Sequence, residues 1–366
     1  MRALTMGVEE EFLLVDKASR RPSDRAAAVI ADAAAELGEQ VQTEFFAAQV
    51  EVCTRPVSDT AGLRAELARL RRTAVAAAEE HGCRLVATGT PAVPPATPLT
   101  VTDTDRYRRM ARAFDALVGR YDGLVCGCHV HVGTMDRATA LALSHHLRPW
   151  LPVLQSLTGN SPFVLGHDTG FDSWRYKQFA RWPTVGPAPV MHEAQYEAYV
   201  GALVEHRILM DRRMLYWYAR PSEHVPTLEI RVADSNADIE TVVLVAALVR
   251  GLAQGLLAEA ERGQPPPEVS DRRLRAAHEL AAAGGLHGRG LDPFSGERLP
   301  ADTLVERLLA RAAPGLEAAG DLSLVEDLLR RLRREGSGAD RQRAALGRCG
   351  RLTGVVDELA AATASF

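Results

Sequence analysis

The chain has 366 residues, 46% of them hydrophobic and 25% charged, so it is long enough to form one large globular domain or two ordinary ones. Its formal net charge of −4 gives no electrostatic reason to expect nucleic acid or an anionic membrane as a partner. Five cysteines, an odd number spread along the chain, favour reduced thiols in a cytoplasmic protein over a framework of disulfides.

Strand-like and helix-like patterns alternate along the first part of the chain. Apolar residues recur there with a period of two or with helical spacing. These patterns predict, in order, strand 3–15, helix 24–37, strand 41–54, helix 59–81, strand 83–89, helix 103–120, strand 123–134 and two helices within 136–158. The segment "TPAVPPATP" (90–98) has four prolines in nine residues, so we expect a loop.

The second part of the chain is predicted to be mostly helical. Segment 159–190 is rich in Gly and Pro but also in charged and aromatic residues, which indicates an ordered functional loop. After it we expect helix 192–208, a hairpin formed by 214–220 and 227–234, and helices from about 238 onward. The longest apolar run, 241–258, carries Arg250 and Gln254 and is expected to be a buried helix, since a membrane span needs about 20 apolar residues.

A proline-rich stretch gives the best candidate for a boundary. "GQPPPE" (263–268) divides a mixed α/β part, residues 1–262, from a helical part, residues 263–366. We expect residues 1–262 to form the catalytic core and the helical part to pack on the same domain.

Four predicted strands repeat one arrangement of side chains. Residues two apart in a strand share a face, so polar side chains gather on one face and apolar ones on the other. The polar pairs are Glu9 and Glu11, Gln49 and Glu51, His129 and His131, and Glu229 and Arg231. Glu10, between two members of the first pair, points to the apolar side.

Each pair taken alone has a simpler explanation. A Glu-x-Glu pair is most often a solvated strand face. A His-x-His pair is often satisfied within a core, and a Glu-x-Arg pair is most often a surface ion pair. Four such strands in one chain indicate instead a single sheet whose charged face binds metal or phosphate.

The residue types indicate which cation this face would bind. Carboxylates outnumber histidines, and no cysteine joins a ligand pattern, so Mg²⁺ or Mn²⁺ is favoured over Zn²⁺. Arg231 would complement a γ-phosphate. The chain has no Walker A or G-x-G-x-x-G motif, so metals and arginines would hold a nucleotide. Glu44 is a further acid, but its odd spacing from Glu51 places both at one site only if the chain bends between them.

The polar motifs occur together and in a recognisable order. "GVEEEFLLVD", "TEFFAAQVEVCT", "GCHVHVG", "GNSPF" with the following "DTG" and "SWR", and "PTLEIRVAD" lie between residues 6 and 234. Together they resemble the bacterial type 2 glutamate–cysteine ligases, which are carboxylate–amine ligases of the glutamine synthetase-like fold. The resemblance implies an α+β fold with an antiparallel catalytic sheet flanked by helices and followed by a helical C-terminal region.

The resemblance also implies a reaction. In such enzymes a substrate carboxylate attacks the γ-phosphate of ATP, and an amine captures the resulting acyl phosphate, with release of ADP and phosphate. ATP and two or three Mg²⁺ (or Mn²⁺) ions are the implied cofactors. The implied partners are a small, glutamate-like carboxylic acid and an amine, with no nucleic acid or membrane, and the enzyme could form a homodimer. The identity of the amine stays open.

The resemblance assigns roles to individual residues. The implied metal ligands are Glu9, Glu11, Glu44, Glu51, His129 and Glu229. The implied catalytic residues are Arg231 and Glu51. The nucleotide-binding candidates are Arg231, Arg220 and Lys177. The substrate-binding candidates are His131, Asn160, Ser173 and Arg175. The last two are suggested by the loop itself, which we expect to form a lid or wall, and the alternative that they are surface residues of an ordered loop stays open.

Two other functions remain open from the residues. A hydrolase or oxygenase could use the His-x-His pair and one glutamate around Zn²⁺ or Fe²⁺, but a single metal would not need four or five carboxylates and Arg231. A non-catalytic relative could bind nucleotide and regulate a partner, and we would then expect metal positions to be missing.

Overall fold

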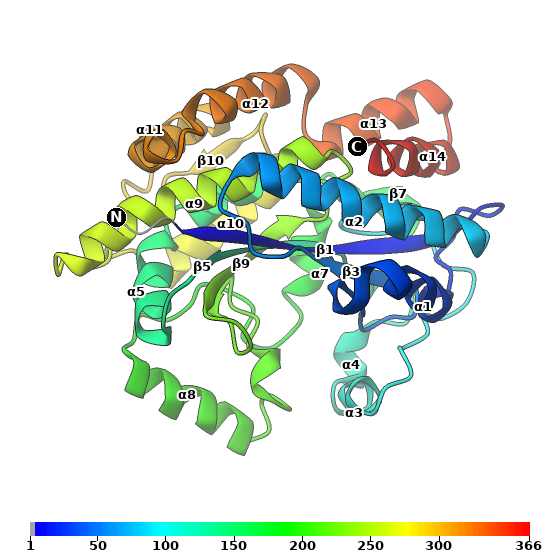
Figure 1. Cartoon of the computed structure of the whole chain (residues 1–366), viewed down its shortest axis with the longest axis horizontal. Coiled ribbons are helices and arrows are strands. Elements are labelled where there is room, and N and C mark those ends of the chain that lie inside the picture. Colours follow the sequence, from blue (N-terminus) through cyan, green and yellow to red (C-terminus); the bar gives the residue numbers. More distant parts are fainter. Residues whose placement is uncertain (1–3) are drawn as a thin grey trace.

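The computed structural model describes residues 4–366, and an antiparallel sheet lies at its centre. The strand order is β2-β3-β1-β5-β9-β8, with β4 paired to the C-terminal part of β1 (Figure 1). The strands are β1 (Thr5–Asp16), β2 (Val41–Thr43), β3 (Gln49–Cys53), β4 (Cys83–Val86), β5 (Gly127–Gly133), β8 (Ala219–Pro221) and β9 (Thr227–Asp234). This sheet confirms the predicted α+β class. The predicted first residue of the first strand, residue 3, lies outside the described residues.

One face of the sheet is apolar and is covered by α2 (Thr60–Glu80) and α9 (Ile239–Glu261), which lie above β1 in Figure 1. Val8, Val130 and Ile230 are at most 2% exposed and share one core with leucines of both helices. Burial of each such side chain stabilises the fold by about 1.5–3 kcal/mol. Because side chains alternate along a strand, this packing turns the intervening polar residues to the opposite face.

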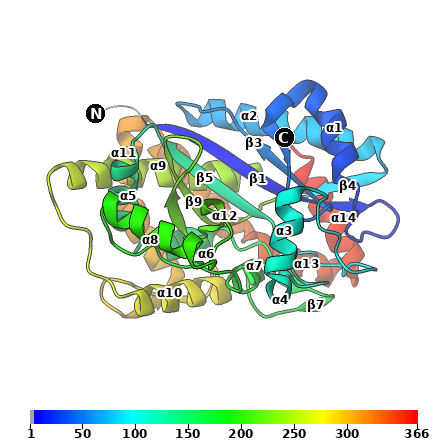
Figure 2. The ribbon, with the colours of Figure 1, turned by 90° about the horizontal axis from the view of Figure 1, so that it is seen from below.

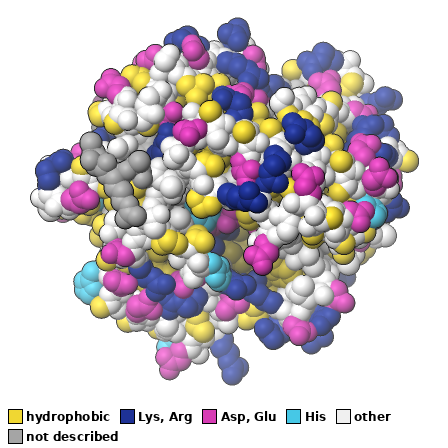
Figure 3. Space-filling model, viewed as in Figure 1, with side chains coloured by type: hydrophobic (Ala, Val, Ile, Leu, Met, Phe, Trp, Pro, Cys, Tyr) yellow, Lys and Arg dark blue, Asp and Glu magenta, His cyan; other side chains and the backbone are white. Residues whose placement is uncertain are grey.

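The opposite face is covered by loops and shorter helices. They include α3 (Asp105–Ala113), α7 (Trp174–Phe179) and α8 (Glu193–Glu205), and the turned view shows α3 and α8 on this side (Figure 2). The remaining helices of this part are α1 (Ala26–Leu37), α4 (Asp115–Val118), α5 (Arg137–Leu147) and α6 (Leu151–Leu157). Basic and acidic side chains are interspersed over the surface shown in Figure 3.

Helix α9 is the buried helix that the sequence predicts. By length and composition it could cross a membrane, but 78% of its most apolar window is buried within the protein. Its one arginine in that region, Arg250, is buried and pairs with Asp321 and the carbonyl of Ser58. Gly251 on α9 faces Gly315, where an added Cβ would lie 2.1 Å from the carbonyl oxygen of Gly251, so only glycine permits this close contact.

The C-terminal region is helical and packs on the rest of the chain. Its elements are α10 (Asp271–Gly284), β10 (Arg289–Leu291), β11 (Arg298–Pro300), α11 (Ala301–Ala319), α12 (Leu322–Glu335), α13 (Gly338–Cys349) and α14 (Leu352–Thr363). Leucines of α11 share the core of α9, while Val355 and Val356 of α14 share a second core with β4. The proposed boundary at 262/263 falls in the connection between α9 and α10, and the division into two parts stays a prediction.

Three predicted elements differ from the structure. Segment 41–54 is two paired strands joined by a turn, because Gln49 bonds back to Phe46 through both its backbone N–H and its side-chain oxygen. Segment 103–120 is broken into α3 and α4 at Phe114. Segment 159–190 is not all loop, since it contains the short hairpin β6 (Phe163–Val164) and β7 (His167–Asp168) and then α7.

Candidate active site

Strand register aligns the polar pairs into one stripe across the sheet. Glu11 lies opposite Glu51, Glu9 opposite His129, and His131 opposite Glu229. Directly opposed residues have Cβ atoms about 4.5–5.5 Å apart, so neighbouring pairs are within contact range. The stripe therefore joins β3, β1, β5 and β9 on the face away from α2 and α9.

Two groups of ligand atoms lie in this stripe. Glu9, His131 and Glu229 form one, and Glu11, Glu44 and Glu51 form the other, with the ligand atoms of each group within 4.8 Å of one another. Glu44 reaches the second group because it lies in the turn between β2 and β3, which is the bend that its spacing from Glu51 requires.

His129 lies between the two groups. Its Nδ1 is 3.2 Å from Glu9 Oε2 and 3.5 Å from Glu229 Oε1, and its Nε2 is 3.8 Å from Glu11 Oε1. Within residues 4–366, the buried His129 Nε2 has no partner with hydrogen-bond geometry, whereas His131 Nε2 lies 3.0 Å from Glu9 Oε1. A buried nitrogen without a partner among carboxylates fits the ligand set of a divalent cation, because such an atom is otherwise costly to bury.

The two ligand groups differ in electrostatics. Burial and the neighbouring carboxylates raise the pKa of Glu51 well above its ordinary value, and burial together with Glu11 raises the pKa of Glu44 to about 7. Burial also opposes ionisation of Glu229, but Arg220 and Arg231 outweigh it and hold its pKa well below the usual range. The group that contains Glu11 is thus the one with an uncompensated excess of acid.

A bulge in β9 shapes the site around Arg231. Val130 pairs with Ile230 and Cys128 with Ala233, so β9 has one extra residue opposite His129. Arg231 forms an ion pair with Glu229, and its Nη1 lies 3.4 Å from His129 Nδ1. Its Nε has no partner among the described residues, so the guanidinium keeps donor capacity directed into the site.

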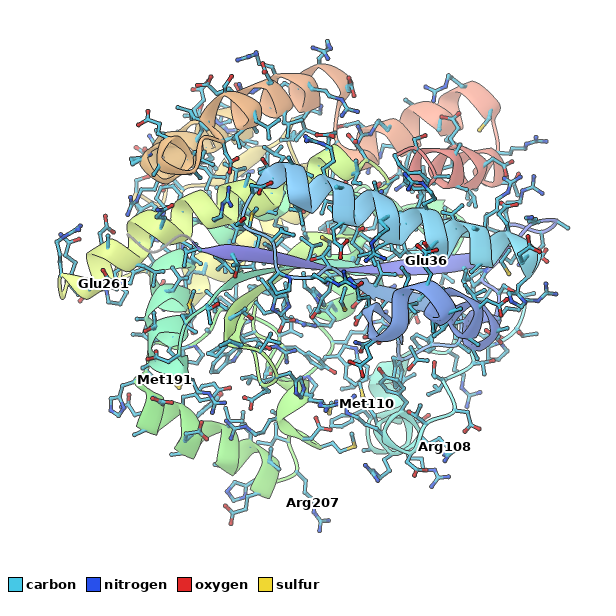
Figure 4. The ribbon with its side chains drawn as sticks, viewed as in Figure 1. Glu36, Arg108, Met110, Met191, Arg207 and Glu261 are labelled. Atoms are coloured by element: carbon cyan, nitrogen blue, oxygen red, sulfur yellow. The ribbon has the colours of Figure 1, made fainter. Side chains whose placement is uncertain are left out.

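A cavity of about 90 Å³ opens beside the second ligand group. Its polar lining is Glu11, Glu44, Gln49, Arg175 and Arg231, and its apolar wall includes Phe45, Phe46, Met110, Phe179, Trp182 and Tyr216. Figure 4 labels Met110 on the side of α3 toward the middle of the molecule, with Arg108 on the outer side. The acidic stripe thus has a largely aromatic pocket next to it.

The other predicted site residues lie around this centre. Arg220 donates to Glu229 Oε2 at 2.8 Å. Ser173 and Asn160 are buried and bond to Asp234 through the serine hydroxyl and the asparagine backbone N–H. Lys177 forms an ion pair with Glu279 of α10 at 2.7 Å. The substrate and nucleotide roles proposed for these residues stay predictions.

Asp234 and Gly127 belong to this region but were not predicted. Asp234 is the last residue of the quoted "TLEIRVAD" motif, three residues after Arg231, and an odd spacing puts it on the other face of a regular strand. The bulge reverses that order, and Asp234 pairs with Gly127 on the polar side. The sequence did not indicate the bulge.

Comparison with known proteins identifies the family. Residues 5–360 match the profile described as glutamate–cysteine ligase family 2 (GCS2). The chain belongs to this family. It is 46% identical over 353 residues to the "Putative glutamate–cysteine ligase 2" of Salinispora tropica, covering 95% of this chain and 91% of that protein. The "Putative glutamate–cysteine ligase 2-1" of Saccharopolyspora erythraea is 46% identical over 344 residues, 94% of this chain and 90% of the relative.

Solved structures share the fold. The glutamate–cysteine ligase of Francisella tularensis, solved with AMP, has a TM-score of 0.72 at 13% identity, covering 100% of this chain and 90% of that one. A bifunctional glutathione synthetase from Pasteurella multocida also has a TM-score of 0.72, at 14% identity over 99% of this chain. The chain spans about half of that protein, 52% of its length. As a family member the chain is an ATP-dependent carboxylate–amine ligase, which confirms the predicted enzyme class over the hydrolase and non-catalytic alternatives.

Proposed function

We propose that this ligase joins a small, glutamate-like carboxylic acid to an amine through an acyl phosphate and releases ADP and phosphate. The reaction would use ATP with two or three Mg²⁺ or Mn²⁺ ions. The observation that carries the proposal is the pair of ligand groups on one sheet face, one of two glutamates and a histidine and one of three glutamates, next to Arg231, whose Nε has no partner among the described residues.

The two ligand groups would hold the cations. Glu9, His131 and Glu229 supply one set of ligand atoms, Glu11, Glu44 and Glu51 supply the other, and His129 lies between them. Bound divalent cations would neutralise the phosphates and align them for transfer. The positive charges of these cations would also offset the burial and the repulsion between carboxylates that raise the pKa values of Glu44 and Glu51.

Arg231 would act on the transferring phosphoryl group. Its guanidinium is buried beside Glu229, and burial strengthens its interaction with the charge that develops on the equatorial oxygens. Glu229 and His129 both contact its Nη1, which would limit its reorganisation when the phosphoryl group moves. Arg220 donates a hydrogen bond to the other carboxylate oxygen of Glu229, Oε2, and so keeps this carboxylate in place.

The cavity beside Glu44 would hold one of the small substrates. Its aromatic wall excludes water from an acyl phosphate, which would otherwise be hydrolysed. Arg175 lines the same cavity, and its guanidinium would pair with a substrate carboxylate or phosphate. We also propose that the enzyme acts in the cytoplasm on free small molecules, and a homodimer is one assembly it could form.

The test is release of ADP and phosphate by the purified chain with Mg²⁺ or Mn²⁺ over a panel of amino acids and amines. We expect ADP release to need the acid, the amine and the metal together, and Glu9→Gln and Glu51→Gln to abolish it. The exposed Glu39→Gln variant is the matched control and should retain activity. The proposal would be contradicted if ADP formed but no acid–amine pair of the panel gave an amide product.

A further inference from the structure

The buried carboxylate of Asp234 receives three hydrogen bonds from one loop. Ser173 Oγ donates to Oδ1 at 2.7 Å, while Ser161 Oγ and the backbone N–H of Asn160 donate to Oδ2 at 2.6 and 2.9 Å. Asp234 is 1% exposed, and burial raises its pKa in spite of these bonds and of the charge of Arg175. Burying a carboxylate costs free energy. Among the described residues all three hydrogen bonds to this one come from the same loop, so its function is best explained as holding that loop in position.

The same loop leads directly to Arg175. Ser161 donates to Asp234 and accepts a hydrogen bond of 3.0 Å from the backbone N–H of Arg175. The guanidinium then lies over Gly127, where an added Cβ would be 2.3 Å from Nη2. Arg175 is 4% exposed, its Nε has no partner in the described part of the chain, and it lines the cavity with Glu11 and Arg231.

A helix of the C-terminal region holds the loop from its other side. Gln342 of α13 donates to Asn160 Oδ1 and to its backbone oxygen at 2.8 and 2.9 Å. Arg343 donates to Asp172 Oδ1 at 2.6 Å and to the carbonyl of Phe171 at 2.8 Å. The loop is therefore fixed between Asp234 and α13.

We propose that Asp234 is a positioning residue for the ligase reaction, which holds the 159–173 loop on β9 and so sets the guanidinium of Arg175 at the cavity beside the metal-binding face. The proposal rests on the proposed function, because it takes Arg175 to contact a substrate. It assigns to Asp234 no contact with substrate, metal or nucleotide.

A double-mutant cycle tests whether Asp234 acts through Arg175. Asp234→Asn places an amide N–H₂ among three donors, so at least one hydrogen bond to the loop must rearrange. In the wild-type background we expect Asp234→Asn to lower kcat/KM for the acid substrate about 10- to 100-fold, a loss of about 1.4–2.7 kcal/mol in transition-state binding. In an Arg175→Ala background the same change should cost less than about 3-fold, because residues that act as one unit are not additive.

A milder variant keeps the test valid if Asp234→Asn does not fold. Ser173→Ala removes one hydrogen bond and should lower kcat/KM about 3- to 10-fold with the same dependence on Arg175. Ser156→Ala is the matched control, since this buried serine bonds only to Val153 of its own helix and should leave kcat/KM unchanged. Equal losses in both backgrounds, or an Arg175→Ala variant with normal kcat/KM, would overturn the proposal.

Hydrogen exchange separates this proposal from the proposed function. Peptides covering residues 159–176 should exchange faster in Ser173→Ala and Asp234→Asn, with exchange elsewhere unchanged. This measurement needs no turnover, so it decides the positioning role even if the wild-type chain releases no ADP and the proposed function fails. Unchanged exchange in this segment, or a uniform increase over the chain, would overturn the positioning role of Asp234.

Discussion

The three consecutive glutamates of β1 show how one residue type meets different environments. Glu9 and Glu11 lie on the polar face of the sheet, in separate groups of candidate metal ligands. Glu10 is 0% exposed on the apolar face and pairs with Arg71 of α2. This agrees with the prediction that Glu10 points away from the polar face. Alternation along the strand separates like charges that the sequence places side by side, so the cost of repulsion falls on cross-strand neighbours such as Glu11 and Glu51.

The crowded group around Glu44 predicts a pH dependence of stability in the metal-free protein. The pKa of Glu44 is raised from 4.5 to about 7, so its contribution to folding is fully present below pH 4.5 and is lost as the pH rises through 7. Glu44→Gln should therefore raise Tm in a chelator at pH 8 but not at pH 5. The check is Tm against pH for wild type, Glu44→Gln and the exposed control Glu39→Gln, and a constant difference between wild type and Glu44→Gln across this range would contradict the assignment.

Added Mg²⁺ extends the same measurement. It should raise Tm of the wild-type protein at pH 8, because binding to the folded state alone stabilises it. The rise should be much smaller in Glu44→Gln, which loses one carboxylate ligand.

Arg231 carries the second residue-scale prediction. Arg231→Lys keeps the charge but loses the planar fork that pairs with Glu229 and, in the proposed mechanism, would also reach a phosphate oxygen. We expect kcat to fall about 10²–10³-fold, about 3–4 kcal/mol, with a smaller change in ATP affinity, because the charge it opposes grows during transfer. The measurement is kcat, the Kd for ATP and Tm for this variant and for the exposed control Arg213→Lys. A folded Arg231→Lys variant with near-normal kcat would leave Arg231 with only its structural ion pair.

At the scale of elements, the Arg71 side chain joins α2 to β1 and to the connection after β9. It donates to Glu10 of β1 and to the carbonyls of Asn236 and Ala237, in the connection between β9 and α9, at 2.7 Å each. All of these contacts are buried, so the clamp fixes the middle of β1 relative to the chain that follows β9. The relative positions of the candidate ligands Glu9 and Glu229 depend on that relation.

Loss of one partner of this clamp should be costly. Arg71→Ala leaves Glu10 and two carbonyls buried without their donor, and breaking a buried pair in this way costs about 3–5 kcal/mol. Arg72→Ala, the next residue of α2, is exposed and should cost less than about 1 kcal/mol. Urea unfolding of both variants measures the two free energies, and similar small losses would mean that water or a shift of α2 satisfies Glu10.

The periodicity and composition of the sequence were enough to predict most helices and strands. The elements and contacts that were not predicted lie where the chain bends. Alternation predicted β1, β5 and β9 and the shared face of Glu9, Glu11 and Glu229, because that face follows from backbone geometry once a strand forms. The turn that brings Glu44 to Glu51 depends on two bonds between Gln49 and Phe46, for which the sequence has no recognised turn pattern. The bulge that turns Asp234 and the ion pair of Glu10 with Arg71 involve residues far apart in the chain, and such partners leave no local pattern in the sequence.

At the scale of the whole molecule, the C-terminal helices are tied to the active site. Helix α13 forms hydrogen bonds with the 159–173 loop, and apolar residues of α14 pack with those of β4 in the second core. The sequence predicted a helical region after residue 262 but gave it no role. Its contacts indicate that it supports the 159–173 loop, so a truncation before α13 would expose both the loop and the second core.

Arg343 offers a test that does not remove the whole helix. Its guanidinium binds Asp168, Asp172 and the carbonyl of Phe171, and Asp172 is only 5% exposed. Arg343→Ala leaves Asp172 without its charged donor, which should cost about 1.5–3 kcal/mol. Because the loop carries Ser173 and leads directly to Arg175, we also expect KM for the acid substrate to rise about 3- to 10-fold. We expect kcat to change less, because we propose that it depends on Arg231.

Arg348 supplies the matched control on the same helix. It pairs with Glu358 at the surface, with 61% of its side chain exposed, so Arg348→Ala should cost less than about 1 kcal/mol and leave KM unchanged. Steady-state kinetics and urea unfolding of the two variants would be compared at a temperature where both are folded. A rise in KM shared by both variants would point to a general loosening of α13. A loss of stability in Arg343→Ala with unchanged KM would mean that this helix supports the fold but does not set the position of the loop, because only a loop held from both sides transmits the loss of Arg343 to Arg175.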